Sequence, residues 1–259
     1  MSEKKIEASA ELYVKSALFY LVLFTFTLVW TSMGMIIAPA LPYRRRFNFI
    51  IGNYTRFVIH WLRLCCNVSY QVIGTENIPK EPCIIYSKHQ STWETFFLQT
   101  LFSPQAPVIK KELLSIPFFG WCFSLLAPIA IDRSKKREAM AQIISQGQER
   151  LEDNIWVLIF PEGTRVNPGE RKPFSKGAAR LSVTTGKPIL PVAHNSGDHW
   201  PNQQFLKYPG QIKVVIGAAI SPEGKTIETL NAEGEQWVNS TTQAIHVNSR
   251  EQDYFGQLT

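Results

Sequence analysis

The feature that most constrains the fold of this chain is a long uncharged run near its N-terminus. Ala17 to Leu41 contains no Asp, Glu, Lys or Arg, and about 20 apolar residues are enough for a helix to cross a bilayer. Hydroxyl side chains inside the run can hydrogen-bond back to their own helix; they are Thr25, Thr27, Thr31 and Ser32. Pro39 and Pro42 end the helical pattern. The run therefore predicts a membrane-seated helix that either crosses the bilayer or enters one leaflet.

A cleaved signal peptide is the main alternative for this run, because Ala38-Pro39-Ala40 resembles a cleavage site. The apolar run is longer than a typical signal core, and the residues before it balance three Lys against three Glu. Signal peptides begin with a clear positive charge. We therefore expect a retained anchor.

The segment after the anchor is basic and aromatic. Arg44, Arg45 and Arg46 come first, and the positive-inside rule then places the downstream chain in the cytoplasm. Phe47 to Val68 continues as an amphipathic helical pattern, in which the polar residues recur at spacings of three and four; they are Asn53, Arg56, His60 and Arg63. Such a helix is suited to the headgroup layer of a membrane, and it is equally suited to packing against a globular domain.

Charge and cysteine content narrow the partners of this 259-residue chain. The net charge of +6 is carried beside apolar segments, which favours a membrane surface with anionic lipids over nucleic acid. The spacing of the four cysteines suggests neither zinc nor a disulfide framework. We expect reduced thiols, no metal, and a membrane protein, integral or monotopic, whose catalytic domain faces the cytoplasm.

Beyond residue 68, short apolar segments alternate with helical patterns. Predicted strands are Tyr70–Ile73, Cys83–Tyr86, Ala127–Ile131, Ile155–Phe160, Ile189–Ala193 and Ile212–Ile216. Predicted helices are Ser91–Phe102, Phe118–Leu126, Ser134–Leu151, Lys176–Thr185 and Asn231–His246. This alternation predicts an α/β fold with a mixed, largely central sheet flanked by helices, preceded by the membrane-seated helical pair. We divide the chain into an anchor, residues 1–68, and an α/β domain, residues 69–259.

His89 and Glu94 form the first candidate site. Residues five apart on a helix lie on different faces, so the two side chains meet only if His89 lies in the loop before the helix and Glu94 in its first turn. A carboxylate would then orient an imidazole that acts as a base. Ser91 to Glu94 is also a capping box, in which Glu94 would serve only backbone amides. The spacing alone leaves both interpretations open.

A charged turn after an apolar strand forms the second candidate site. Pro161 ends the strand, Gly163 permits an unusual backbone conformation, and Arg165 follows with donors suited to phosphate. A surface turn with a Glu162–Arg165 ion pair explains the same residues. Lys110 and Arg133 also follow strand-like segments and could help to neutralise an anion.

Four segments in this order resemble the 1-acylglycerol-3-phosphate acyltransferases of the glycerolipid acyltransferase superfamily. The segments are His89 to Glu94, Ala127 to Arg133, Phe160 to Arg165 and Ile189 to Val192. The resemblance extends over roughly Tyr70 to Ile220. It departs from the family at one site residue, since the family has Asp where this chain has Glu94.

The resemblance implies an O-acyltransferase. His89 would deprotonate the free sn-2 hydroxyl of 1-acylglycerol 3-phosphate, which would attack the thioester of acyl-CoA or acyl carrier protein and give phosphatidic acid. Glu94 would assist His89, and no cofactor would be needed. The acceptor phosphate would be bound by Arg165 and Lys110, with Arg133, Glu162, Gly163 and Thr164 completing that set.

Two other functions are open to the same residues, and a third lacks the motif that it needs. An acyltransferase for another lysolipid acceptor would share the whole site. A lipid-binding protein without catalysis would keep the basic helix and Arg165 but would not need His89. A serine esterase would need a Gly-x-Ser-x-Gly elbow, which the sequence lacks.

Overall fold

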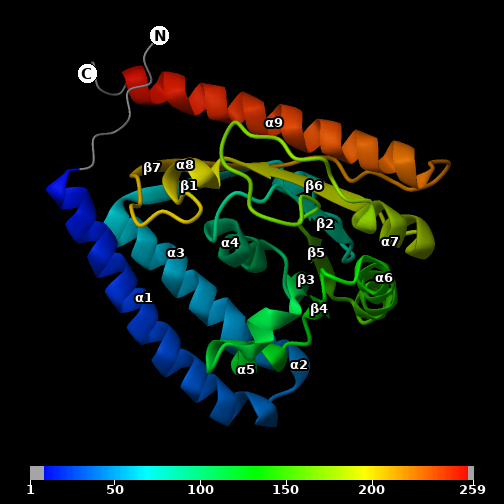
Figure 1. The fold of residues 1–259 in the computed structure, drawn as a ribbon, viewed down its shortest axis with the longest axis horizontal. Helices are drawn as coiled ribbons and strands as arrows, with labels where there is room; N and C mark the ends of the chain where they lie inside the picture. The colour runs from blue at the N-terminus through cyan, green and yellow to red at the C-terminus, as the bar shows by residue number, and fades with distance from the viewer. Residues whose placement is uncertain (1–8, 256–259) are drawn as a thin grey trace.

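The computed structural model describes residues 9–255, which form a seven-stranded sheet with helices on both faces (Figure 1). The helices are α1 (Ala10–Ile37), α2 (Tyr43–Phe47), α3 (Asn53–Cys66), α4 (Trp93–Leu101), α5 (Phe119–Ser124), α6 (Lys136–Glu152), α7 (Gly177–Thr185), α8 (Ser196–His199) and α9 (Ile227–Phe255). The strands are β1 (Val68–Ile73), β2 (Ile84–Ser87), β3 (Gln105–Lys110), β4 (Ile129–Ile131), β5 (Trp156–Ile159), β6 (Ile189–His194) and β7 (Gly210–Ile216).

The sheet is mixed, as the sequence predicts. Its order is β1-β7-β6-β2-β5-β3-β4, and every neighbouring pair is parallel except β6 and β7. The sequence patterns missed β3 because Pro107 interrupts it, and proline is usually absent from the interior of a sheet. Pro107 lies where β3 changes partner, since residues up to it pair with β5 and Val108 begins the pairing with β4.

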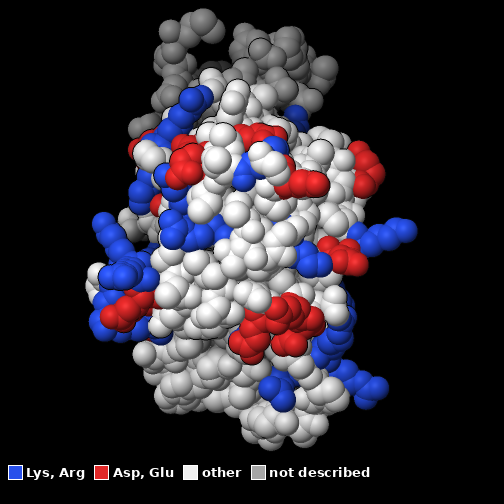
Figure 2. Space-filling model, turned by 90° about the vertical axis from the view of Figure 1, so that its right-hand side faces the viewer, with Lys and Arg blue, Asp and Glu red and all other residues white. Residues whose placement is uncertain are grey.

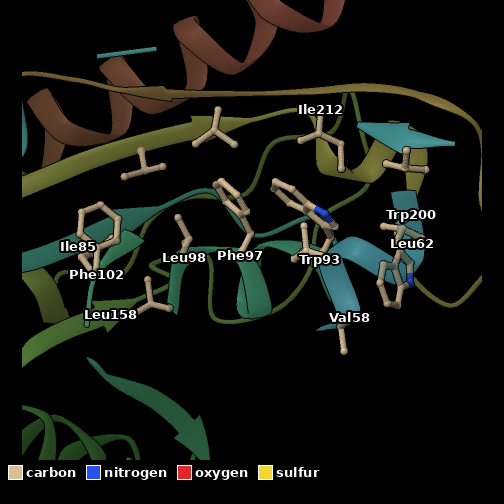
Figure 3. Packing of buried hydrophobic residues seen from close by; sticks show 14 of the residues in the cluster. Val58, Leu62, Ile85, Trp93, Phe97, Leu98, Phe102, Leu158, Trp200 and Ile212 are labelled. Carbon is tan, nitrogen blue, oxygen red and sulfur yellow. The ribbon is translucent and has the colours of Figure 1, made fainter. Parts of the chain in front are cut away.

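Alternate residues of the central strands build a core on each face of the sheet. Ile84 and Tyr86 of β2 pack with α6, α7 and α9, whereas Ile85 points to the face covered by α3 and α4. Figure 3 shows Trp93, Phe97 and Leu98 of α4, with Phe102 just after its end, on this second face. The sheet is therefore buried on both sides, which explains why its strands are almost continuously apolar.

The apolar helix α1 lies against this second core. Phe19 and Leu23 are buried within it, and the hydroxyls of Thr25, Thr27, Thr31 and Ser32 bond to backbone oxygens of α1, as predicted. Contacts between α1 and the segment that includes α3 recur along the helix. Trp61 Nε1 donates to the Phe19 carbonyl, Thr27 Oγ1 bonds Tyr54 Oη, and Trp30 Nε1 donates to the Ile50 carbonyl. The two helices run side by side in Figure 1.

The amphipathic pattern of α3 is confirmed, with its apolar face in the core. Val58 and Leu62 are fully buried, while Asn53, Arg56, His60 and Arg63 are exposed. The four cysteine thiols are free and buried. Basic and acidic side chains are interspersed on the face drawn in Figure 2, unlike the basic stripe of many nucleic-acid-binding proteins.

Candidate functional site

The candidate site lies at the carboxyl ends of β2 and β5, where α/β sheets usually bind ligands. Because the two strands are parallel neighbours, the segments that follow them emerge together. His89 follows β2 and Phe160 follows β5, and their rings stack with centroids 3.9 Å apart and planes at 14°. The Phe160 ring therefore fixes the plane of the imidazole.

The carboxylate of Glu94 meets the His89 ring, as the loop-then-helix interpretation predicts. Glu94 Oε1 lies 2.8 Å from His89 Nδ1 and also accepts hydrogen bonds from the backbone amides of Gln90 and Ser91. The Ser91 hydroxyl accepts from the amide of Trp93. Glu94 thus serves backbone donors and orients the imidazole at once, and the two interpretations of the spacing are compatible.

Burial and charge set the protonation of this pair. Burial lowers the pKa of His89; the bond and charge of Glu94 oppose this, and the Arg165 and Arg133 charges add to it. Burial alone would raise the pKa of Glu94, but attraction to the His194 and His89 rings and hydrogen bonds from His89 and the Ser91 amide bring it to about 2. At neutral pH the site therefore holds a neutral imidazole beside a carboxylate, which is the arrangement of a general base.

His89 opens onto a cleft of about 480 Å³. Three basic residues predicted from the sequence line this cleft, Lys110, Arg133 and Arg165, and so does Thr164. The Nε of Arg165 is buried and has no hydrogen-bond partner among the described residues. An unpaired buried donor is costly unless a ligand completes it, so the cleft is suited to an anion.

Much of the remaining wall of the cleft is apolar, and threonine, asparagine and glutamine side chains line it as well. The apolar part includes Ile51, Phe96, Leu113, Phe119 and Phe123, which come from the segments around α3, α4 and α5. The cleft therefore offers a charged end beside His89 and an apolar surface suited to a hydrocarbon chain.

Two residues of the predicted phosphate set lie differently from Arg165. Glu162 is buried, where its carboxylate pairs with Lys88 Nζ and accepts the His89 amide at 2.7 Å. Gly163 has φ of 70°, and its carbonyl accepts a hydrogen bond from Arg133. Neither residue lines the cleft. Glu162 instead holds the backbone amide of His89. The Gly163 carbonyl holds the guanidinium of Arg133 by a hydrogen bond.

Sequence reasoning missed the support provided by Lys88 and Phe160. Lys88 directly precedes His89, yet its side chain is buried, and nothing in the local pattern distinguishes it from an exposed lysine. Phe160 reads as the end of a core strand, and its stacking on His89 depends on which strands are neighbours. Each role depends on a contact between segments far apart in the chain, Lys88 with Glu162 and Phe160 with His89, which local sequence patterns do not show.

Comparison with known proteins gives a consistent result. The sequence profile of a family described as Acyltransferase matches residues 69–195. A 1-acyl-sn-glycerol-3-phosphate acyltransferase of Pseudomonas aeruginosa is 49% identical over 90% of this chain and 91% of its own. The human 1-acyl-sn-glycerol-3-phosphate acyltransferase beta is 28% identical, covering 86% of this chain and 79% of its own.

A solved structure shares the fold. The crystal structure of the 1-acyl-sn-glycerophosphate acyltransferase of Thermotoga maritima superposes with a TM-score of 0.75, covering 91% of this chain and 96% of that one. Its sequence identity is 22%, so the match supports the mixed α/β architecture.

Proposed function

The chain belongs to the 1-acyl-sn-glycerol-3-phosphate acyltransferase family, and we propose that it acylates the free sn-2 hydroxyl of 1-acylglycerol 3-phosphate from a thioester, giving phosphatidic acid. The observation that carries this proposal is the His89–Glu94 pair beside the unpartnered Arg165 Nε in one cleft. That arrangement provides a base next to a site for an anion. The acceptor supplies both a hydroxyl and a phosphate.

In this mechanism His89 first accepts a proton from the acceptor hydroxyl and then donates it to the leaving group. Since Nδ1 bonds Glu94, Nε2 takes the proton of the sn-2 hydroxyl as its oxygen attacks the thioester carbonyl carbon. The carbon–sulfur bond of the tetrahedral intermediate then breaks, and the leaving thiolate takes the proton from Nε2. Glu94 stabilises the imidazolium that exists between these steps. Neither an acyl-enzyme nor a metal takes part in this sequence.

The cleft binds the two ends of the acceptor differently. Arg165, supported by Lys110 and Arg133, binds the phosphate, because guanidinium groups match phosphate oxygens with two donors. The apolar wall accommodates acyl chain. The leaving thiol belongs to coenzyme A or to acyl carrier protein.

Membrane association follows from the outer face of α1, which is apolar and exposed. It includes Leu21, Phe24 and Ile36, with exposed fractions of 66%, 67% and 80%, and the helix is long and apolar enough to cross a membrane. However, α1 contacts the rest of the protein from Lys15, whose carbonyl bonds Cys65, to Trp30. A helix held along its length in this way fits one leaflet, on the cytoplasmic side, better than a full crossing.

The test of the catalytic proposal compares His89→Ala with His60→Ala, which removes an exposed histidine of α3. Phosphatidic acid formed from lysophosphatidate and acyl-CoA is measured by mass spectrometry, and free thiol in parallel. We expect His89→Ala to lose at least about 1,000-fold of kcat and His60→Ala to keep the wild-type rate. Thiol release that persists without lysolipid would indicate a thioesterase. A faster reaction with another lysolipid would identify that lysolipid as the preferred acceptor. Wild-type turnover by His89→Ala would refute the proposal that His89 is the general base.

The one-leaflet position of α1 is tested with cysteine introduced at Tyr13 and, as a control, at Glu223, both of which are exposed. The native cysteines are buried. In oriented membrane vesicles we expect an impermeant maleimide to label both positions from the same side. Labelling from opposite sides would show that α1 crosses the bilayer.

A further inference from the structure

A second buried imidazole lies close to the proposed base, and the mechanism above assigns it no role. His194 ends β6 and Ser196 begins α8, and both are fully buried. Ser196 Oγ donates to Glu94 Oε2 at 2.7 Å and lies 3.0 Å from His194 Nδ1. His194 Nε2 lies 2.8 Å from the carbonyl oxygen of Lys88.

Ser196 completes the hydrogen bonding of the Glu94 carboxylate. Oε1 has three donors, the His89 ring and the amides of Gln90 and Ser91. For Oε2, the Ser196 hydroxyl is the donor found among the described residues. A buried carboxylate oxygen without a donor favours protonation of the group. The Ser196 hydroxyl therefore gives Oε2 a donor, which favours the carboxylate form of Glu94 and holds its second oxygen in place.

His194 connects Ser196 to the loop that carries His89. A carbonyl oxygen only accepts, so Nε2 of His194 carries a hydrogen that it donates to Lys88. In the neutral ring, which burial favours by lowering the pKa of His194, Nδ1 is then an acceptor. It accepts from the backbone amide of Ser196 at 3.5 Å, because the one hydroxyl hydrogen of Ser196 is donated to Glu94. Hydrogen bonds therefore link the Lys88 carbonyl through His194, the amide and hydroxyl of Ser196, and Glu94 to the ring of His89, the residue that follows Lys88.

We propose that Ser196 and His194 are positioning residues of the acyltransferase site: Ser196 holds Glu94 as an anion, and His194 holds the backbone of Ser196 and the loop that carries His89. This inference rests on the proposed function. The groups that face Glu94 are the rings of His89, on the loop after β2, and His194, on β6. The Lys88–Glu162 pair is close enough for the Glu94 charge to act on Glu162. Neither Ser196 nor His194 lines the cleft, so they act only through Glu94 and the loop.

The experiment measures kcat and KM against pH for Ser196→Ala. Loss of the Ser196 donor leaves one oxygen of Glu94 unheld and more of its negative charge free to act on the His89 ring, which raises the pKa of His89. We therefore expect kcat at pH 7 to fall roughly 10-fold and the acid limb of kcat/KM to move up by roughly one pH unit. KM for lysophosphatidate and for acyl-CoA stays within about twofold of the wild-type value, as expected for residues outside the cleft. Ser196→Cys, which keeps the size of the side chain and a weak donor, gives an intermediate result.

Ser182→Ala is the matched control. Ser182 is also fully buried, and its hydroxyl donates to the Lys187 carbonyl, away from Glu94. Its pH profile stays that of the wild type even if its melting temperature falls. His194→Gln keeps a side-chain donor for the Lys88 carbonyl and retains more activity than His194→Ala.

Two results would overturn the inference: a folded Ser196→Ala protein with wild-type kcat and acid limb, or the same kinetic change in Ser182→Ala. If Ser196→Ala does not fold, Ser196→Cys decides in the same way. These failures differ from failure of the proposed function. In that case the wild-type protein makes no phosphatidic acid, or His89→Ala remains active.

Discussion

Replacing Glu94 with Gln tests the centre of the proposed mechanism with little change of shape. The amide oxygen can still face the His89 ring and the amides of Gln90 and Ser91, which all meet Oε1 in the native protein. The amide nitrogen then meets the Ser196 hydroxyl in place of Oε2. The negative charge is lost, while the backbone contacts of the loop are kept.

The size of the effect follows from the imidazolium that forms during turnover. With His89 Nδ1 2.8 Å from Oε1, the centres of the two charges are roughly 4 Å apart, where an ion pair at an effective dielectric constant of about 20 gains about 4 kcal/mol. Each 1.4 kcal/mol, approximately, changes a rate tenfold. We therefore expect kcat of Glu94→Gln to fall about 1,000-fold, with KM for lysophosphatidate nearly unchanged.

The assay follows phosphatidic acid formation by the purified protein in lipid–detergent micelles at saturating acyl-CoA. Glu138→Gln is the control, because Glu138 is an exposed helical residue that pairs with Lys135, and such pairs contribute little. Circular dichroism checks that both variants are folded. A Glu94→Gln enzyme within threefold of the wild-type kcat would refute the claim that the carboxylate charge drives the reaction.

Three other predictions concern the charges around the base. Arg165→Ala removes the unpartnered donor of the cleft, so KM for lysophosphatidate should rise roughly 10- to 100-fold while KM for acyl-CoA stays constant; equal changes in both would contradict phosphate binding. A base acts when it is neutral, and burial lowers the pKa of His89 below 6.5. The acid limb of kcat/KM should therefore lie below pH 6.5, and a limb above pH 7 would contradict a lowered pKa of His89. Lys88→Met leaves Glu162 charged and buried, so it should destabilise the fold by about 3–5 kcal/mol in urea unfolding, and adding Glu162→Leu should restore most of this; additive losses would show that the pair is not coupled.

The sequence was enough to predict the candidate site residues that depend on local chain pattern, but not the residues that support them from distant segments. Local spacing placed His89 in a loop and Glu94 in the first turn of a helix, and the structure confirms their contact. Arg133 and Arg165 were recognised because each follows a strand-like segment. These predictions depend on neighbours in the chain, where propensity and turn chemistry act.

Contacts between distant segments were the part that the sequence could not show. The sequence placed Glu162 in the phosphate-binding set, with an ion pair to Arg165 as the alternative, yet Glu162 lies buried with Lys88, because β2 and β5 are adjacent in the sheet. The strand containing Pro107 was missed for a similar reason, since proline is tolerated there only because β3 changes partner at that point. The division into residues 1–68 and 69–259 stays a prediction, although both parts contribute to one core.

The packing of α1 has a consequence for attempts to prepare a soluble fragment of the enzyme. Phe19 and Leu23 fill the same core as Trp93 of α4 and Ile212 of β7, so trimming the chain before α3 would uncover apolar surface on the catalytic part itself. The truncated protein would aggregate more readily than the full chain, because the surface newly exposed to water is apolar and is not covered by membrane lipid. Solubility is therefore better sought by replacing the outward residues of α1, such as Leu21 and Phe24, than by deletion.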